Sequence, residues 1–185
     1  MKILITGATG FAGGYLLRYL SDNYGIENVH GTGRSHSKAA KLSDEGFTIK
    51  VGDLVDPEFV NSQLRSYDLI VHCAAKSSVW GSYDSFYKAN VVATKNLLEV
   101  INSEQQLIYI STANIYFNFQ NRRSVCEGDI LPDSFNNHYA ATKYKAEQLV
   151  LAHQKEAFVT VLRPRAILGV GDTVVFPRLL RAHKE

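Results

Sequence analysis

The sequence predicts an α/β protein with a doubly wound parallel sheet that carries helices on both faces. Three observations lead to this fold class. Short apolar runs alternate with longer segments of helical period, a glycine-rich turn joins the first run to the first helix, and no linker, repeat or low-complexity run interrupts the pattern. Right-handed crossovers between parallel strands then give a doubly wound sheet. Residues 1–185 are therefore expected to form one domain.

The first half of the chain is expected to hold three strand–helix pairs. In order, these are a strand at Lys2–Thr6, a helix at Phe11–Tyr24, a strand at Val29–Arg34, a helix at Ser35–Glu45, a strand at Phe47–Val51 and a helix at Pro57–Ser66. The first helix is expected to pack through one face, made of Tyr15, Leu16, Tyr19 and Leu20. A proline suits the first turn of the third helix, because the N–H groups of a first turn have no acceptor within the helix and the N–H that proline lacks is not needed there.

The second half continues the alternation with longer helices. The expected elements are a strand at Asp68–Ala74, a helix at Tyr83–Asn102, a strand at Leu107–Ser111, a loop at Asn118–Phe135, a helix at Tyr139–Lys155, a strand at Phe158–Leu162 and a helical stretch at Val174–Lys184. The loop carries charge, Gly and Pro without a clear period. In such a sheet the ligand binds at the carboxyl ends of the strands, near the point where the strand order reverses.

Composition argues against several classes of partner. The 20 basic and 18 acidic residues leave a net charge of +2, too even for a nucleic-acid or anionic-membrane partner. The short apolar start ends in a glycine turn, unlike a signal peptide, and no window approaches the roughly 20 apolar residues of a membrane span. Cys73 and Cys126 lack metal-ligand spacing, so we expect two free thiols, no metal site and a cytoplasmic protein.

The turn after the first strand predicts a dinucleotide site of the Rossmann type. Gly7, Gly10 and Gly13 permit a tight turn, a close backbone approach to pyrophosphate, and close helix–strand packing. The helix that follows offers free N–H groups and its positive dipole end to the phosphates. The expected cofactor contacts here are Gly7, Thr9, Gly10, Phe11, Ala12 and Gly13. The alternative is a structural turn in an unrelated α/β protein.

The end of the second strand favours NADP(H), with NAD(H) possible. No carboxylate stands there to take a ribose 2′-hydroxyl, whereas Arg34 can grip a 2′-phosphate and stack on adenine. A solvated surface arginine is the alternative. Asp53, followed by Leu54, can accept from the adenine amino group or cap a helix. The small residues Ala74 and Ala75, followed by Lys76, let the backbone pass close to a cofactor, although core packing would explain the alanines equally well.

A catalytic pair is expected on the helix that begins near residue 139. Tyr139 and Lys143 lie four residues apart and share one helical face. A lysine charge nearby would lower the tyrosine pKa from about 10 and suit the phenol to proton transfer. Thr112 follows the fifth strand, and its hydroxyl can hydrogen-bond to a substrate carbonyl in the same crevice. An exposed Tyr–Lys pair, common by chance, is the alternative.

Several motifs together resemble the extended short-chain dehydrogenase/reductases. These motifs are TGATGFAG, HCAA, KANVVATKNLLE, STANIY, YAATK and LRPRAILGVGD, and they run through nearly the whole chain. The family includes sugar-nucleotide epimerase/dehydratases and 3β-hydroxysteroid dehydrogenase-like enzymes, and the chain is most similar to the latter branch and its bacterial 2-alkyl-3-oxoalkanoate reductases.

The resemblance implies roles for individual residues. It makes Thr112 the substrate-orienting hydroxyl, Tyr139 the acid/base, and Lys143 the residue that binds the nicotinamide ribose. Pro164 resembles part of the segment that lies against the nicotinamide, and Asn90 resembles a helix residue near the active site that is usually structural.

The activity implied is NADP-dependent hydride transfer to or from a keto or hydroxy carbon of a lipid- or steroid-like small molecule. An NAD-dependent sugar-nucleotide epimerase or dehydratase and a non-catalytic dinucleotide-binding module are the alternatives. Family members continue into a smaller C-terminal lobe that closes over the substrate, and this lobe is absent here. We therefore expect cofactor binding with little turnover, and a homodimer through the helices at Tyr83–Asn102 and Tyr139–Lys155.

Overall fold

The computed structural model describes residues 1–78, 80–172 and 175–183, and it contains one open sheet of six parallel strands. The strands are β1 (Ile3–Thr6), β2 (Val29–Gly33), β3 (Thr48–Val51), β4 (Leu69–His72), β5 (Gln106–Ile110) and β6 (Phe158–Leu162). Their order is β3-β2-β1-β4-β5-β6, and every neighbouring pair is parallel. The chain moves outward from β1 to β3 and then returns to place β4 beside β1. This order confirms the predicted fold class.

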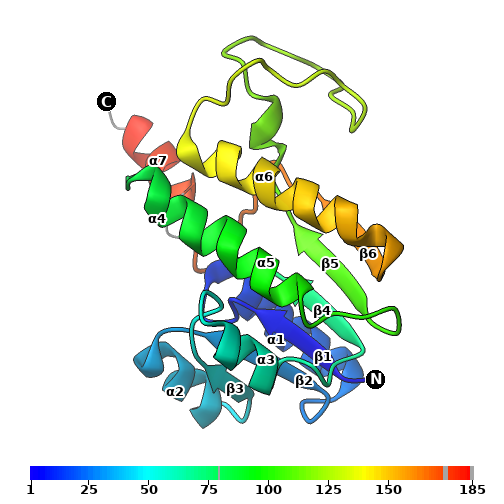
Figure 1. Cartoon of the computed structure of the whole chain (residues 1–185). Helices are drawn as coiled ribbons and strands as arrows, with labels where there is room; N and C mark the ends of the chain where they lie inside the picture. The colour runs from blue at the N-terminus through cyan, green and yellow to red at the C-terminus, as the bar shows by residue number, and fades with distance from the viewer. Residues whose placement is uncertain (79, 173–174, 184–185) are drawn as a thin grey trace.

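Helices cover both faces of the sheet (Figure 1). One face carries α1 (Phe11–Tyr24) and α2 (His36–Asp44). The other face carries α3 (Pro57–Gln63), α4 (Tyr83–Tyr87), the π-helix η1 (Lys88–Val92), α5 (Ala93–Leu98) and α6 (His138–Ala152). Two 3₁₀ turns, η2 (Ala113–Tyr116) and η3 (His153–Lys155), and the helix α7 (Val175–Ala182) complete the described elements.

The two cores follow from the alternation of side chains along buried strands. Successive residues of β1 point to opposite faces, so Leu4 packs with α3, α5 and α6 while Ile3 and Ile5 pack with α1 and α2. All three side chains are fully buried. Continuous apolar runs of this kind are typical of a parallel sheet that is covered on both sides.

The buried face of α1 matches the prediction only in part, because Leu16 and Leu20 pack against the core whereas the two tyrosines do not. Tyr15 and Tyr19 are 68% and 56% exposed, whereas the helix faces the sheet with Gly13, Gly14 and Leu17. The absence of side chains at the two glycines lets α1 lie close to the sheet, and this close contact selects the glycine face over the aromatic one.

The long helix predicted at Tyr83–Asn102 is present and runs unbroken from Tyr83 to Leu98, with one wider turn inside it. It consists of α4, the π-turn η1 and α5, and it ends at Leu98. The apolar period continues through η1, so the pattern alone gave no sign of the wider turn. At the C-terminal end, α7 replaces the predicted Val174–Lys184 stretch, and both end residues of that prediction lie outside the described residues.

Strand β6 forms one edge of the sheet and is only partly covered. Phe158 and Leu162 are 76% and 47% exposed, and within the described ranges β5 is the neighbour that pairs with β6. The loop between η2 and α6 extends beyond the sheet (Figure 1). Both cysteines are free thiols, as predicted. Across the part of the chain that can be described, every helix is too short or too polar to cross a membrane.

Candidate active site

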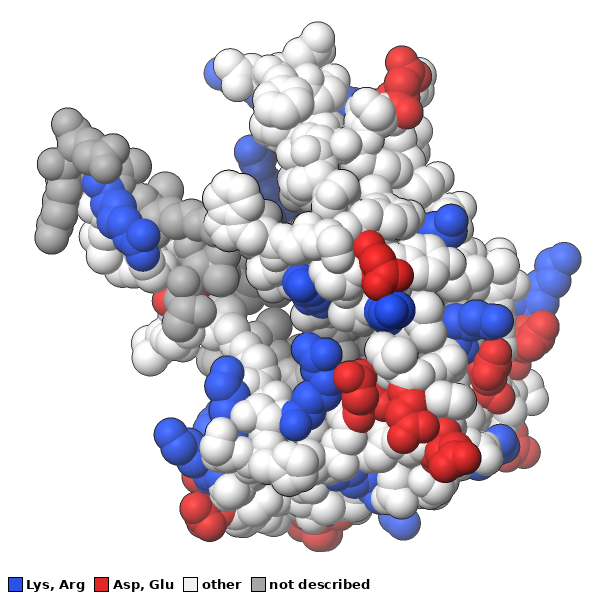
Figure 2. All heavy atoms as spheres, turned by 60° about the vertical axis from the view of Figure 1, so that its left-hand side comes forward, with Lys and Arg blue, Asp and Glu red and all other residues white. Residues whose placement is uncertain are grey.

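A cleft of about 1560 Å³ runs along the carboxyl ends of the strands. It brings together most of the predicted site residues, namely Gly7, Thr9, Gly10, Phe11, Ala12, Gly13, Arg34, Asp53, Leu54, Ala74, Ala75, Thr112 and Tyr139. The molecule is hollowed between its upper and lower parts, with Lys and Arg side chains nearby (Figure 2). The lining carries Arg34, Lys38, Arg122, Arg123 and Arg165 against Asp53 and Asp172. This excess of positive charge favours an anionic ligand.

The glycine turn has no room for side chains at two positions. Gly7 has a φ of +69°, and a Cβ there would lie 2.8 Å from the Ala74 Cα. A Cβ on Gly13 would lie 2.3 Å from the Gly7 carbonyl oxygen. Both positions therefore require glycine, and the turn brings the backbone of β1 against that of β4.

The N-terminus of α1 is open toward the cleft. Its N-cap residue, Gly10, has no side chain to bond to the first amides, and its first turn contains no acidic residue. Phe11, Ala12 and Gly13, the first residues of the helix, line the cleft. Free amides at the positive end of a helix bind phosphate groups, so this turn fits the pyrophosphate of a dinucleotide.

Arg34 stands at the end of β2 and is exposed. Its guanidinium lies 3.4 Å from the Asp53 carboxylate, and the two side chains are 66% and 46% exposed. An exposed ion pair of this kind contributes less than about 1 kcal/mol. Arg34 can therefore leave Asp53 and bind a phosphate at little cost. Ser35 caps α2 by accepting from the Lys38 amide.

Asp53 does not cap a helix. Its carboxylate accepts from the Val55 amide at 3.0 Å, whereas Asp56 caps α3 by accepting from the Glu58 amide at 2.9 Å. Of the two roles considered for Asp53, the capping role is therefore absent, and the side chain lines the cleft beside Leu54.

Lys76 and Asn90 lie behind the wall of the cleft rather than in its lining. Asn90 is buried, accepts from the Lys76 amide at 2.7 Å and donates to the Thr142 hydroxyl at 3.0 Å. The Lys76 ammonium donates to the Ser85 hydroxyl at 2.9 Å. Asn90 thus joins the segment after β4 to α6, which agrees with the structural role that the resemblance implies.

Behind the glycine turn, a chain of hydrogen bonds runs through the buried His72. The Thr6 hydroxyl lies 2.7 Å from His72 Nδ1, and the Thr94 hydroxyl lies 2.9 Å from His72 Nε2. Thr94 donates to the Asn90 carbonyl, so it accepts from Nε2–H, and Nδ1 then accepts from Thr6. Both ring nitrogens are satisfied in the neutral form. Burial lowers the His72 pKa to about 3.

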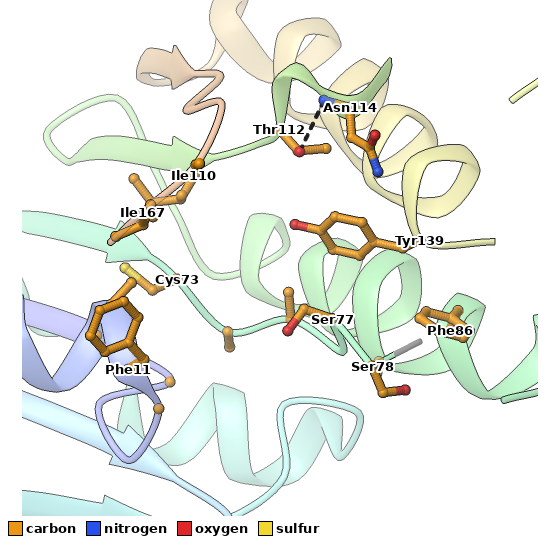
Figure 3. A pocket seen from close by; sticks show the side chains of 18 of the residues that line it. Phe11, Cys73, Ser77, Ser78, Phe86, Ile110, Thr112, Asn114, Tyr139 and Ile167 are labelled. Atoms are coloured by element: carbon orange, nitrogen blue, oxygen red, sulfur yellow. Dashed lines mark hydrogen bonds between the residues drawn. The ribbon is translucent and has the colours of Figure 1, made fainter. Parts of the chain in front are cut away.

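The Tyr139 ring reaches into the cleft with its phenol oxygen on the side of Thr112 (Figure 3). The Thr112 hydroxyl accepts from the Asn114 amide at 3.1 Å, which fixes it at the start of η2. Burial raises the pKa of Tyr139, and the nearby Thr112 opposes this rise. The structure therefore brings the two predicted hydroxyl groups together.

Lys143 lies beneath the cleft and is buried. Its ammonium donates to the Ile110 carbonyl at 2.6 Å and sits 4.0 Å above the Tyr109 ring. Burial lowers its pKa to about 7. The expected net lowering of the Tyr139 pKa is not seen, because burial of the phenol raises this pKa and outweighs the opposing influence of Thr112.

Pro164 lies in a neighbouring apolar groove rather than in the cleft. This groove has a volume of about 370 Å³ and is also lined by Ala12 and Ile110. The next residues of the same segment, Arg165 and Ile167, line the main cleft. Figure 3 places Ile167 beside Ile110 and near Phe11.

Sequence reasoning missed Glu147, a fully buried carboxylate on α6. Its carboxylate forms an ion pair with Arg163 at 2.5 Å. The signal was present, because Tyr139, Lys143 and Glu147 are spaced by four residues and so share one face of the helix.

Comparisons with known proteins agree with the fold and the site. A model described as "NAD dependent epimerase/dehydratase family" matches residues 3–185. The chain therefore belongs to this family, which confirms the resemblance to extended short-chain dehydrogenase/reductases. The relatives are oxidoreductases and epimerases, so this is a family of enzymes.

Individual relatives place the chain within that family. It is 38% identical over 184 residues to a 2-alkyl-3-oxoalkanoate reductase of Stenotrophomonas maltophilia, covering 97% of this chain and 54% of the relative. It is 27% identical to a Saccharomyces cerevisiae sterol-4-alpha-carboxylate 3-dehydrogenase, with 99% and 56% covered. A UDP-glucuronic acid 4-epimerase of Bacillus cereus, solved in complex with NAD, superposes with a TM-score of 0.81 at 25% identity, with 99% and 62% covered. The chain spans about half the length of the curated relatives it matches.

Proposed function

We propose that this chain is the dinucleotide-binding part of an NADP-dependent oxidoreductase. Its reaction transfers hydride between nicotinamide and a keto or hydroxy carbon of a lipid- or steroid-like small molecule. One observation carries the proposal: Thr112 and Tyr139 line the same cleft as the glycine turn and Arg34. The 2-alkyl-3-oxoalkanoate reductases and the sterol dehydrogenase among the relatives support the reaction type and the substrate class.

The cleft fits a dinucleotide along its length. The amides at the start of α1 would hold the pyrophosphate, Arg34 the 2′-phosphate, and Asp53 the adenine amino group. When bound, the cofactor supplies or accepts the hydride at nicotinamide C4.

The chain's own residues then handle the substrate oxygen. The Thr112 hydroxyl hydrogen-bonds to the carbonyl oxygen and orients it. In the reductive direction the carbonyl carbon gains the hydride and its oxygen takes a proton from the Tyr139 phenol. Lys143 favours the phenolate left behind only in its protonated form, so the charge state of this buried lysine matters to the step.

An NAD-dependent sugar-nucleotide epimerase or dehydratase is the second candidate. It is favoured by the solved UDP-glucuronic acid 4-epimerase of Bacillus cereus, which contains NAD in one structure and both NAD and UDP-glucuronic acid in another. The end of β2 argues against it, because Arg34 stands where an acidic residue would take a ribose 2′-hydroxyl. NAD that copurifies with the chain would favour the epimerase.

Calorimetric titration with NADPH and, separately, NADH tests the proposal. We expect both to bind, with NADPH preferred. Equal affinity or a preference for NADH would overturn the NADP assignment, and no binding of either would mean that this chain does not hold a working cofactor site.

The proposal extends to partners and compartment. The substrate is a small molecule, and the helices α4, η1, α5 and α6 form the proposed contact between two copies of the chain. The even charge and the two free thiols support a cytoplasmic protein.

A further inference from the structure

A buried cluster of charges lies directly behind the proposed catalytic face. The Glu147 carboxylate accepts from the Ser111 hydroxyl at 2.6 Å and from the Arg163 guanidinium at 2.5–3.2 Å. Glu147 is fully buried, and the Arg163 side chain is 17% exposed. A buried carboxylate held by a bidentate guanidinium and a hydroxyl is a well-satisfied ion, so the negative charge is retained inside the protein.

Arg163 also reaches the outer wall of the cleft. It donates to the Tyr116 hydroxyl, and to the Glu127 carbonyl at 3.2 Å. The Tyr116 hydroxyl donates to the same carbonyl at 3.0 Å. Tyr116 ends η2, and Glu127 belongs to the loop that extends beyond the sheet. The ion pair thus connects α6 and β6 to the wall that faces the substrate.

Two consecutive residues at the end of β5 are bonded to two consecutive turns of α6. The Ile110 carbonyl accepts from Lys143, and the Ser111 hydroxyl donates to Glu147. Thr112 follows immediately. Because Lys143 and Glu147 are four residues apart on one helical face, they hold the helix in one register against the strand.

We propose that Glu147, fixed by Arg163, is a positioning residue that acts through Lys143. Its carboxylate is the negative charge that favours the protonated form of the buried lysine, and its bond to Ser111 holds the strand end that carries Thr112. This inference rests on the roles given to Lys143 and Thr112 in the proposed function.

The charges around Lys143 single out Glu147. The groups that face the lysine are His72 and Cys73 at the end of β4, Tyr109 on β5, and Tyr139 and Glu147 on α6. Burial lowers the lysine pKa to about 7, and only a negative charge on Cys73 or Glu147 opposes this fall. Burial raises the Cys73 pKa to about 12, so its thiol is neutral at pH 7. Glu147 is then the anion that acts on Lys143.

The test measures the protonation of Lys143 directly in the free chain. Lysine labelled with carbon-13 at Cε is titrated by NMR, and the Lys143 signal is assigned by its absence in Lys143→Arg. In Glu147→Gln we expect the Lys143 pKa to fall by roughly one unit or more, the size expected for one charge a helical turn away in a partly buried site. Glu99→Gln is the matched control, because Glu99 is an exposed carboxylate one turn from Lys95 on α5.

Unchanged titration of Lys143 in Glu147→Gln would overturn the proposal and leave Glu147 as an anchor between α6 and the sheet. Removing the carboxylate alone leaves Arg163 unpaired and can weaken the fold. The double variant Glu147→Gln/Arg163→Met removes both charges, and we expect a smaller fall of the same sign, because the Arg163 charge partly offsets that of Glu147. The measurement needs no cofactor, so its outcome is independent of the NADPH and NADH titrations.

Discussion

The buried imidazole of His72 makes the stability of the chain depend on pH. His72 is fully buried and bonded through both ring nitrogens, and burial, followed by the charge of Lys143, lowers its pKa from 6.5 to about 3. In the unfolded chain the imidazole regains its usual pKa near 6.5. Below pH 6.5 the unfolded chain therefore binds a proton that the native state excludes.

The sign and size of the effect follow from this difference. The contribution of neutral His72 is fully present above pH 6.5 and is lost as the pH falls toward 3. Each pH unit in this window removes about 1.4 kcal/mol. Acidification from pH 7.5 to 4.5 crosses two such units below 6.5, so His72 alone should remove about 2.7 kcal/mol from the free energy of unfolding.

Urea unfolding at four pH values between 7.5 and 4.5 measures this loss. The glutamine of the His72→Gln variant stays neutral at every pH. On acidification below pH 6.5, the free energy of unfolding of this variant should therefore fall less steeply than that of the parent, by about 1.4 kcal/mol per pH unit. Carboxylates elsewhere contribute equally to both proteins and cancel in the difference. His36→Gln, which alters an exposed histidine, should keep the parental slope. Equal slopes for the parent and His72→Gln would refute the reasoning.

Further predictions concern the cofactor cleft and the assembly. Arg34→Gln should weaken NADPH binding roughly 10- to 100-fold, which is the loss expected for one or two charge-assisted hydrogen bonds. NADH binding should be unchanged in the same calorimetric titration. An equal loss of affinity for both cofactors would contradict the 2′-phosphate role of Arg34. Gly13→Ala should abolish dinucleotide binding and lower the melting temperature, because its Cβ would lie 2.3 Å from the Gly7 oxygen, whereas Gly128→Ala, with open space around its Cβ, should change neither. Tyr139→Phe, tested in a fusion of this chain to the C-terminal half of a relative, should bind NADPH normally while ketone reduction falls by at least ~100-fold, and a smaller fall would argue against its acid–base role. Light scattering should give the mass of a dimer; a monomer's mass would argue against the helix-to-helix contact.

Much of the fold could be predicted because local patterns and tertiary packing agree. The apolar runs are buried strands, and the glycine turn stands between β1 and α1 as its spacing indicated. Prediction failed where packing chose between equally periodic patterns. Tyr15 and Tyr19 follow the helical period as well as Leu17 does, and only the contact of α1 with the sheet shows which face is inside.

The residue types of the candidate site could be predicted from the sequence, but the burial of their side chains could not. Thr112 and Tyr139 meet in the cleft, as their positions at a strand end and a helix start implied. The burial of Lys143 depends on how deeply α6 packs on β5, which residue spacing does not encode. Glu147 was overlooked because its partner Arg163 lies just after β6, and that pairing exists only in three dimensions.

The uncovered edge of the sheet has a consequence for the chain in isolation. Among the described residues, β6 pairs only with β5, so the backbone groups on its other side are available to a further strand. Phe158 and Leu162 expose apolar surface beside these groups. An open β-edge flanked by apolar side chains is a template for strand addition. Concentrated solutions of this chain should therefore self-associate progressively through β6. Phe158→Lys should suppress this association and leave the cleft unchanged, because Phe158 begins β6 whereas the cleft lies at the carboxyl ends of the strands.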